Sequence, residues 1–102
     1  MNTRVSFKIA NLLEEKGYPF EYTTVGEVKN VPLNIPTLME VVMWLYEKYD
    51  IWIYVDFYNE NRWFGVFRNK QGVITELFDV FNSPTESYEA AIEYTLNKLI
   101  NI

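Results

Sequence analysis

The sequence predicts an α+β domain in which three helices accompany a three-stranded antiparallel meander, in the order α-(short β)-α-β-β-β-α. Three observations lead to this class. Apolar residues recur with helical spacing in three separate segments. Between the second and the third of these segments, apolar residues follow a two-residue alternation, which turn signals interrupt twice. No linker, repeat or low-complexity run divides the sequence, so we expect a single domain over residues 1–102.

The first helix is expected over residues 5–16. Thr3 is the expected N-cap, and Gly17 suits the left-handed position at which many helices end. Four apolar residues have the spacing of one helical face, which predicts a buried stripe: Val5, Ile9, Leu12 and Leu13.

The segment over residues 18–35 leaves two alternatives open. Strand-forming residues are concentrated in 20–25, and 28–31 can pair back with them as a short hairpin around a turn at Gly26. Because Pro32 has no backbone donor, the segment can instead run as an extended loop.

The second helix is expected to begin at Thr37, because Glu40 follows with the spacing of a capping box. The helix is apolar almost all round, which predicts burial on more than one side or contact with a partner chain. Three residues away from its main apolar face form a candidate self-association stripe, with burial under the N-terminal segment as the alternative: Met39, Met43 and Tyr46.

From Ile51 the period changes to two, which predicts a strand with two distinct faces. One face is mostly aliphatic and suits the core: Ile51, Ile53, Val55 and Phe57. The other is aromatic with one carboxylate: Trp52, Tyr54, Asp56 and Tyr58. Residues 62–68 are expected to return as a second strand after a turn at 59–61, and 73–78 as a third after a turn at 69–72.

The last helix is expected to end near Ile100, and two start signals compete for its beginning. Ser83 followed by Pro84 has the pattern of an N-cap and first turn, and Ser87 offers a later N-cap. The expected buried stripe comprises Tyr88, Ala91, Ile92, Thr95, Leu96 and Leu99.

Composition excludes several kinds of chemistry. The chain has no cysteine and no histidine, which excludes disulfides, thiolate or imidazole metal sites, and Ser-His or Cys-His catalysis. Its four glycines are isolated, so no phosphate-binding loop or dinucleotide fingerprint is present. We therefore predict no metal, no cofactor and no enzymatic activity.

Charge and hydropathy limit the expected partners and location. The net charge is −5, which makes nucleic acid an unlikely partner because phosphate binding needs clustered Lys and Arg. No apolar run approaches the ~20 residues of a membrane span, and nothing near Met1 resembles a signal peptide. A cytoplasmic protein without membrane contact is expected.

The aromatic content of 18% points to a possible binding face. Its candidate residues are Trp52, Tyr54, Asp56, Tyr58, Arg62 and Trp63, with Arg68 nearby. Such rings and cations can stack a sugar, a base or a flat side chain. The alternative, favoured because large exposed apolar patches are uncommon in monomers, is that the first and last helices cover this face.

Carboxylate catalysis is a third possibility, and we do not expect it. Asp56 lies in mid-strand among aromatic residues, which can raise the pKa of a carboxyl group. An Asp in this setting is more often solvated or paired with an Arg across the strands. A second acid would also be needed, and Glu60, Glu76 and Asp79 are candidates only through their proximity in sequence.

Several short signatures occur together: Lys16-Gly17, Pro36-Thr37, Trp44-Leu45, Asp50-Ile51-Trp52-Ile53 and Ser87-Tyr88-Glu89-Ala90-Ala91. With them, nearly the whole chain resembles a family of small uncharacterised proteins carried by phages and mobile elements of gut bacteria. The segment at residues 82–86 is longer than in that pattern. The resemblance implies the architecture and a mobile-element origin, and it carries no activity or site residues.

The function expected from these observations is that of a noncatalytic accessory or interaction module that binds a protein partner or a second copy of itself. Binding of a small ligand or glycan through the aromatic face is the alternative, and a carboxylate-based enzyme comes third.

Overall fold

The computed structural model describes residues 3–25, 28–32 and 34–100, with the side chains of 22–25, 28–32 and 77–78 outside the description. Its elements are α1 (Phe7–Glu15), β1 (Tyr22–Val25), β2 (Val28–Pro32), α2 (Leu38–Tyr49), β3 (Trp52–Asn59), β4 (Arg62–Asn69), β5 (Gly72–Phe81), α3 (Pro84–Tyr94) and the π-helical turn η1 (Thr95–Leu99). The predicted α+β class and element order are confirmed.

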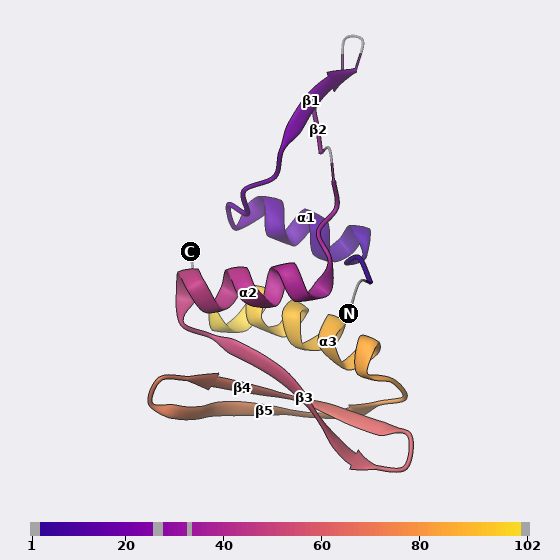
Figure 1. Cartoon of the computed structure of the whole chain (residues 1–102), viewed down its shortest axis with the longest axis vertical. Coiled ribbons are helices and arrows are strands. Elements are labelled where there is room, and N and C mark those ends of the chain that lie inside the picture. The colour runs from indigo at the N-terminus through magenta and orange to yellow at the C-terminus, as the bar shows by residue number, and fades with distance from the viewer. Residues whose placement is uncertain (1–2, 26–27, 33, 101–102) are drawn as a thin grey trace.

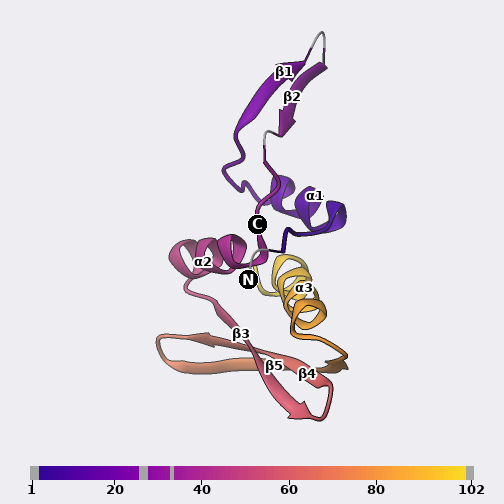
Figure 2. The same cartoon turned by 45° about the vertical axis from the view of Figure 1, so that its right-hand side comes forward.

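The elements form layers along a molecule of 50 × 29 × 19 Å (Figure 1). The antiparallel sheet β3-β4-β5 lies at one end, α2 and α3 lie together over one of its faces, and α1 lies beyond these two helices. Strands β1 and β2 form a separate antiparallel hairpin that projects from the opposite end (Figures 1 and 2). The hairpin alternative for residues 18–35 is therefore correct, although the expected turn residue Gly26 lies outside the described residues.

Helix α1 begins later than expected, at a Ser6 N-cap instead of Thr3. The Ser6 hydroxyl accepts from the Ile9 amide at 3.3 Å. The Thr3 carbonyl instead accepts from the Leu38 amide at 2.8 Å, which ties the N-terminal segment to the start of α2. Gly17 is left-handed (φ +84°) just past the helix, as predicted.

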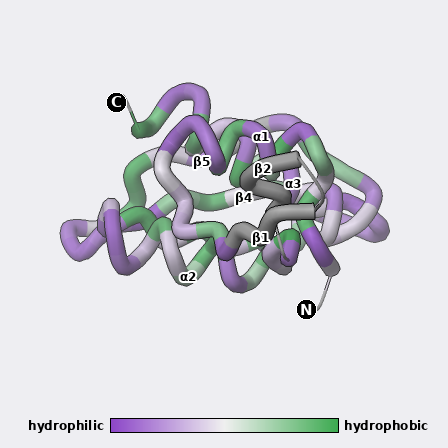
Figure 3. Tube along the Cα trace, turned by 90° about the horizontal axis from the view of Figure 1, so that it is seen from above, coloured by the Kyte–Doolittle hydropathy of each residue, from purple (hydrophilic) through white to green (hydrophobic). Residues whose placement is uncertain are grey.

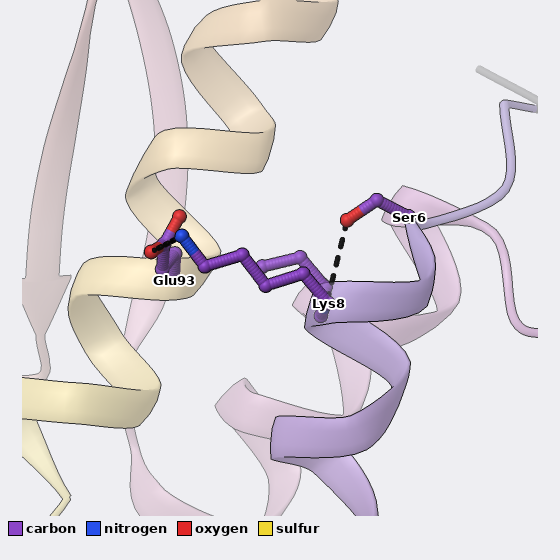
Figure 4. Close-up of polar contacts among 4 residues, drawn as sticks. Ser6, Lys8 and Glu93 are labelled. Carbon is purple, nitrogen blue, oxygen red and sulfur yellow. Dashed lines mark hydrogen bonds and ion pairs between the residues drawn. The ribbon is translucent and has the colours of Figure 1, made fainter.

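A surface ion pair connects α1 to α3. Figure 4 shows the Lys8 side chain reaching from α1 to Glu93, with Nζ 2.7 Å from Oε1. Nearby, the Ser6 amide donates to Glu89 Oε2 at 3.3 Å. Both contacts lie at the surface between α1 and α3, and the apolar contacts beneath them supply more of the stabilisation.

The other two helices begin at signals that are visible in the sequence. Thr37 forms the predicted capping box, because its hydroxyl accepts from the Glu40 amide at 3.2 Å and its amide donates to Glu40 Oε1 at 3.1 Å. Helix α3 uses the earlier of its two signals, since the Ser83 hydroxyl accepts from the Glu86 amide at 3.2 Å. Ser87 is fully buried within α3.

The core lies between the helices and one face of the sheet. In Figure 3, which looks down onto the helices, hydrophobic and hydrophilic residues alternate along the helical turns. The sheet contributes Ile53 and Phe67, which are opposite each other in the β3–β4 register and fully buried. The helical residues of the core cluster are Ile9, Ala10, Leu13, Leu38, Val41, Val42, Leu45, Ala91, Ile92 and Leu96.

The aliphatic face of β3 meets the core only in its first half. Ile51 and Ile53 are buried as predicted, whereas Phe57 is 53% exposed. Phe57 lies near the end of β3, and Figure 1 shows the second half of this strand running away from α2 and α3. Its assignment to the core is therefore wrong, because this end of the strand diverges from the helical layer.

Candidate functional site

The face of the β3-β4-β5 sheet that points away from α2 and α3 is termed the outer face here. Cross-strand pairing places Trp52 opposite Arg68, Tyr54 opposite Val66, and Asp56 opposite Phe64. Side chains of such pairs point to the same side of a sheet. The outer face comprises Trp52, Tyr54, Asp56 and Tyr58 of β3, Arg62, Phe64, Val66 and Arg68 of β4, and Val73, Glu76 and Val80 of β5.

No element of the described chain covers the outer face (Figures 1 and 2). The expectation that the first and last helices bury the aromatic residues is therefore wrong. Helix α3 lies against the other face, where the Tyr94 ring is 5.4 Å from the Phe67 ring, and α1 is a further layer away (Figure 1). Ile53 and Phe67 on the covered face are fully buried and carry no polar side-chain atom, so their burial leaves none without a partner.

The aromatic side chains of the outer face lie partly against the sheet. Tyr58 is 64% exposed, while Trp52, Tyr54 and Phe64 are half-buried. Val66 is only 2% exposed although no described helix lies above it, and its cross-strand neighbours are Tyr54 and Glu76. The side chains of the outer face thus pack against one another, and the apolar surface that they leave exposed is available to a partner.

One predicted member of the binding face lies on the opposite side. Trp63 pairs with Phe57 in the β3–β4 register, and the two rings are 5.3 Å apart in an edge-to-face arrangement. Both therefore lie on the helix side of the sheet. Trp63 is one residue away from Arg62 and from Phe64, and the period of two places these neighbours on the outer face instead.

Asp56 lies on the outer face in an exposed position, and it lines neither of the grooves found there. Its Oδ1 accepts a hydrogen bond from the Phe57 amide at 2.8 Å. The residue opposite is Phe64, not a second acid or an Arg. Of the other acids considered, Glu76 lines one groove on this face and Asp79 lines a separate hollow beside α3. Asp56 therefore shares neither groove with Glu76, and Asp79 lies in a different hollow.

A groove of about 310 Å³ lies where the outer face meets the exposed side of α2, and it is termed the basic groove here. Its lining comprises Tyr46, Trp52, Tyr54, Arg68, Asn69 and Lys70. The Tyr46 and Trp52 rings meet edge-to-face at 5.4 Å and form an aromatic wall. Two cations and no carboxylate are among these residues, although the chain as a whole carries a net charge of −5.

The turn that carries the cations of the basic groove is held by local hydrogen bonds. Asn69 Oδ1 accepts from the Gln71 amide at 2.8 Å, which leaves the Asn69 side-chain amide group as a donor. Asp50 caps α2 in a left-handed conformation (φ 56°), and its Oδ2 accepts from the Lys70 amide at 3.5 Å. These contacts connect the turn between β4 and β5 to the end of α2.

A second groove of about 430 Å³ lies further along the outer face and is termed the mixed groove. Its lining comprises Tyr58, Arg62, Phe64, Glu76 and Val80. The Tyr58 and Phe64 rings are 6.4 Å apart and perpendicular. Because one cation and one carboxylate share this groove, it has no single sign of charge.

The proposed self-association stripe divides between two surfaces. Tyr46 belongs to the basic groove, whereas Met39 and Met43 line a hollow of about 600 Å³ on the flank of α2 with Tyr18, Thr37, Glu40, Trp44 and Glu47. Met43 is 41% exposed, so the N-terminal segment does not bury the stripe.

Aromatic rings form the wall of the α2 flank. The Trp44 ring is 5.1 Å from the Tyr18 ring and 5.5 Å from the Tyr49 ring. Lys48 Nζ lies 5.4 Å from the centre of the Trp44 ring, within the range of a cation–π contact. Burial and, to a smaller extent, the Glu40 carboxylate raise the pKa of Tyr18 above its ordinary value. This flank is therefore acidic and already partly occupied by the chain's own cation.

Sequence reasoning found the aromatic residues of β3 and missed much of the rest. The sequence assigns Asn69 and Lys70 only to a turn, and Phe64 is not among the predicted residues of the binding face. The alternation in β4 contains a signal, because Arg62, Phe64 and Arg68 have the same parity and therefore share a face. No comparable signal in the sequence places Tyr46 of α2 beside Trp52.

Comparisons with protein-family models, with curated proteins and with solved structures found no match to this chain. The resemblance to proteins of phages and mobile elements therefore stays a prediction. No helix in the described part of the chain has the length and apolarity that crossing a membrane requires.

Proposed function

We propose that this protein is a noncatalytic interaction module that binds a protein partner through the outer face of its three-stranded sheet. The observation that carries the proposal is that helices cover only one face of the sheet. Tyr54, Tyr58 and Phe64 have no described helix above them, and Trp52 contacts α2 only at the edge of the face, through Tyr46. Tyr and Trp are enriched at protein interfaces because each combines a large apolar area with a polar atom at its edge.

The form of the surface supports a binding role over a catalytic one. The basic and mixed grooves are open depressions in a sheet, and small-molecule sites usually enclose most of the ligand. Asp56, the acid considered for catalysis, lies outside both grooves. A protein partner can instead cover the whole face, with half-buried rings at the centre and charged side chains at the rim.

Site-specific photocrosslinking in the native host tests this function. A photoreactive amino acid at position 54 or 58 lies on the outer face, and the same group at Asn11 provides a control on α1. We expect a defined crosslinked protein from the first two positions that is lost with Trp52→Ala. If the α1 position crosslinks as efficiently as positions 54 and 58, or if Trp52→Ala leaves the yield unchanged, the outer face is not the interaction surface.

A second candidate, binding of a planar ligand or glycan, is favoured by one observation. The basic groove combines the Tyr46–Trp52 wall with the side-chain donors of Asn69 and Arg68. Titration with sugars and nucleotides should then change the tryptophan fluorescence in the wild type and leave it unchanged in Trp52→Phe. Unchanged fluorescence in the wild type across the panel would exclude this candidate.

A further inference from the structure

We propose that the basic groove recognises an acidic peptide segment of a protein partner, with a carboxylate side chain seated between Arg68 and Lys70 and an aromatic or aliphatic neighbour against Trp52 and Tyr54. This inference rests on the proposed function, because it assigns a chemistry to the partner of the outer face. The lining residues, their donors and the shape of the face carry it.

The polar lining of the basic groove consists mainly of hydrogen-bond donors. Arg68 and Lys70 are exposed cations with no ion pair among the described residues, and the Oδ1 acceptor of Asn69 is already used within the turn. Asp50 is not among the lining residues, and its Oδ2 accepts from the Lys70 backbone amide. A set of donors with little internal acceptor capacity is complementary to an anion, and Arg binds carboxylates in a two-point geometry.

The aromatic wall favours an occupant with an apolar or planar group, which a free inorganic anion lacks. The Tyr46 and Trp52 rings and the half-buried Tyr54 border the cations directly. An occupant that uses the whole groove therefore carries an anionic group beside an apolar or planar one, as Asp or Glu next to an aromatic residue does.

The charge distribution along the outer face distinguishes a peptide from a nucleic acid. Beyond the basic groove the face carries Glu76, which is opposite Val66, and Asp56, which is opposite Phe64, and the next cation, Arg62, lies past both carboxylates. A polyanion that follows the strands would meet these carboxylates, whereas binding to phosphates requires cations along the whole track. A peptide avoids this repulsion when its acidic residues lie only at the end that binds the basic groove.

The length of the face also suits an extended peptide. Strand β3 has eight residues, and each residue of an extended chain rises about 3.3 Å. A segment of about eight residues therefore reaches from the basic groove to the mixed groove. The first groove would bind its acidic end, and Tyr58 and Phe64 would bind its apolar end.

A selection from a displayed library of random peptides about twelve residues long tests the inference. We expect the purified wild-type protein to enrich peptides in which Asp or Glu adjoins an aromatic residue. In fluorescence anisotropy, the affinity of a labelled selected peptide should fall by about tenfold or more in the double variant Arg68→Gln/Lys70→Gln. The matched control is Lys16→Gln/Lys98→Gln, which removes two cations elsewhere and should leave the affinity unchanged.

The possible outcomes separate this inference from the proposed function. Selected peptides without an acidic preference that depend on Tyr54 and Tyr58 but not on Arg68 and Lys70 would overturn the inference and leave the interaction face intact. Selected peptides that are indifferent to all four residues would overturn both. A selection that enriches no peptide overturns the inference, and so does a single-stranded oligonucleotide or inorganic phosphate that displaces the peptide at equal concentration.

Discussion

The assignment of the two faces of β3 gives a direct prediction about stability. Ile53 and Tyr54 are neighbours in the same strand, but Ile53 is fully buried against the helices and Tyr54 is half-buried on the outer face. Replacement of either by alanine reduces the preference for the strand by a similar amount, so that contribution largely cancels in the comparison. The difference between Ile53→Ala and Tyr54→Ala therefore reports which face forms the core.

The expected magnitudes follow from burial. Ile53→Ala removes three buried carbons at about 0.8 kcal/mol each, and the cavity left beside Phe67 brings the loss in unfolding free energy to about 3 kcal/mol. Tyr54→Ala should cost about 1 kcal/mol, because solvent already reaches part of the ring. For a domain of this size, the larger loss lowers the melting temperature by roughly 12–20 °C.

Urea denaturation followed by circular dichroism measures both losses, and Ile53→Val, expected to cost about 1 kcal/mol, provides a variant that keeps the fold. The reasoning is refuted if the Tyr54→Ala loss equals or exceeds the Ile53→Ala loss at low protein concentration. If such equality occurred only at high concentration, it would show that a second copy covers the outer face.

Three further predictions concern other contacts. Thr37→Ala should cost about 1 kcal/mol in urea denaturation because it removes one arm of the capping box, and Thr37→Ser should restore most of the loss; equal stability of all three proteins would contradict this role. Because burial and Glu40 raise the pKa of Tyr18, the unfolded chain loses this proton more easily, so stability should fall as the pH rises above about 10. In Tyr18→Phe, stability should decrease less steeply with pH. An equal decrease in both proteins would show that other groups cause it. A double-mutant cycle on Lys8 and Glu93 should give a coupling below about 1 kcal/mol that decreases with salt, and a larger coupling would show that the pair positions α1.

The sequence by itself determined the local elements of this protein. The helical period of α2 and α3, the alternation along β3 and the capping signals at Thr37 and Ser83 depend on residues only a few positions apart, so they can be read without knowledge of the fold. The aromatic side chains of β3 were found in the same way. The N-cap of α1 could not be predicted from neighbouring residues, because Leu38, which is distant in sequence, holds the backbone of Thr3.

The tertiary structure alone decided which face of the sheet is covered. Both faces of β3 are apolar or aromatic, so the alternation shows that two faces exist and leaves their assignment open. That assignment depends on where α2 and α3 dock, and the register of β4 then excludes Trp63 from the outer face and includes Phe64. The basic groove cannot be predicted from local sequence patterns, because Tyr46, Trp52 and Lys70 come from three separate segments that only the complete fold brings together.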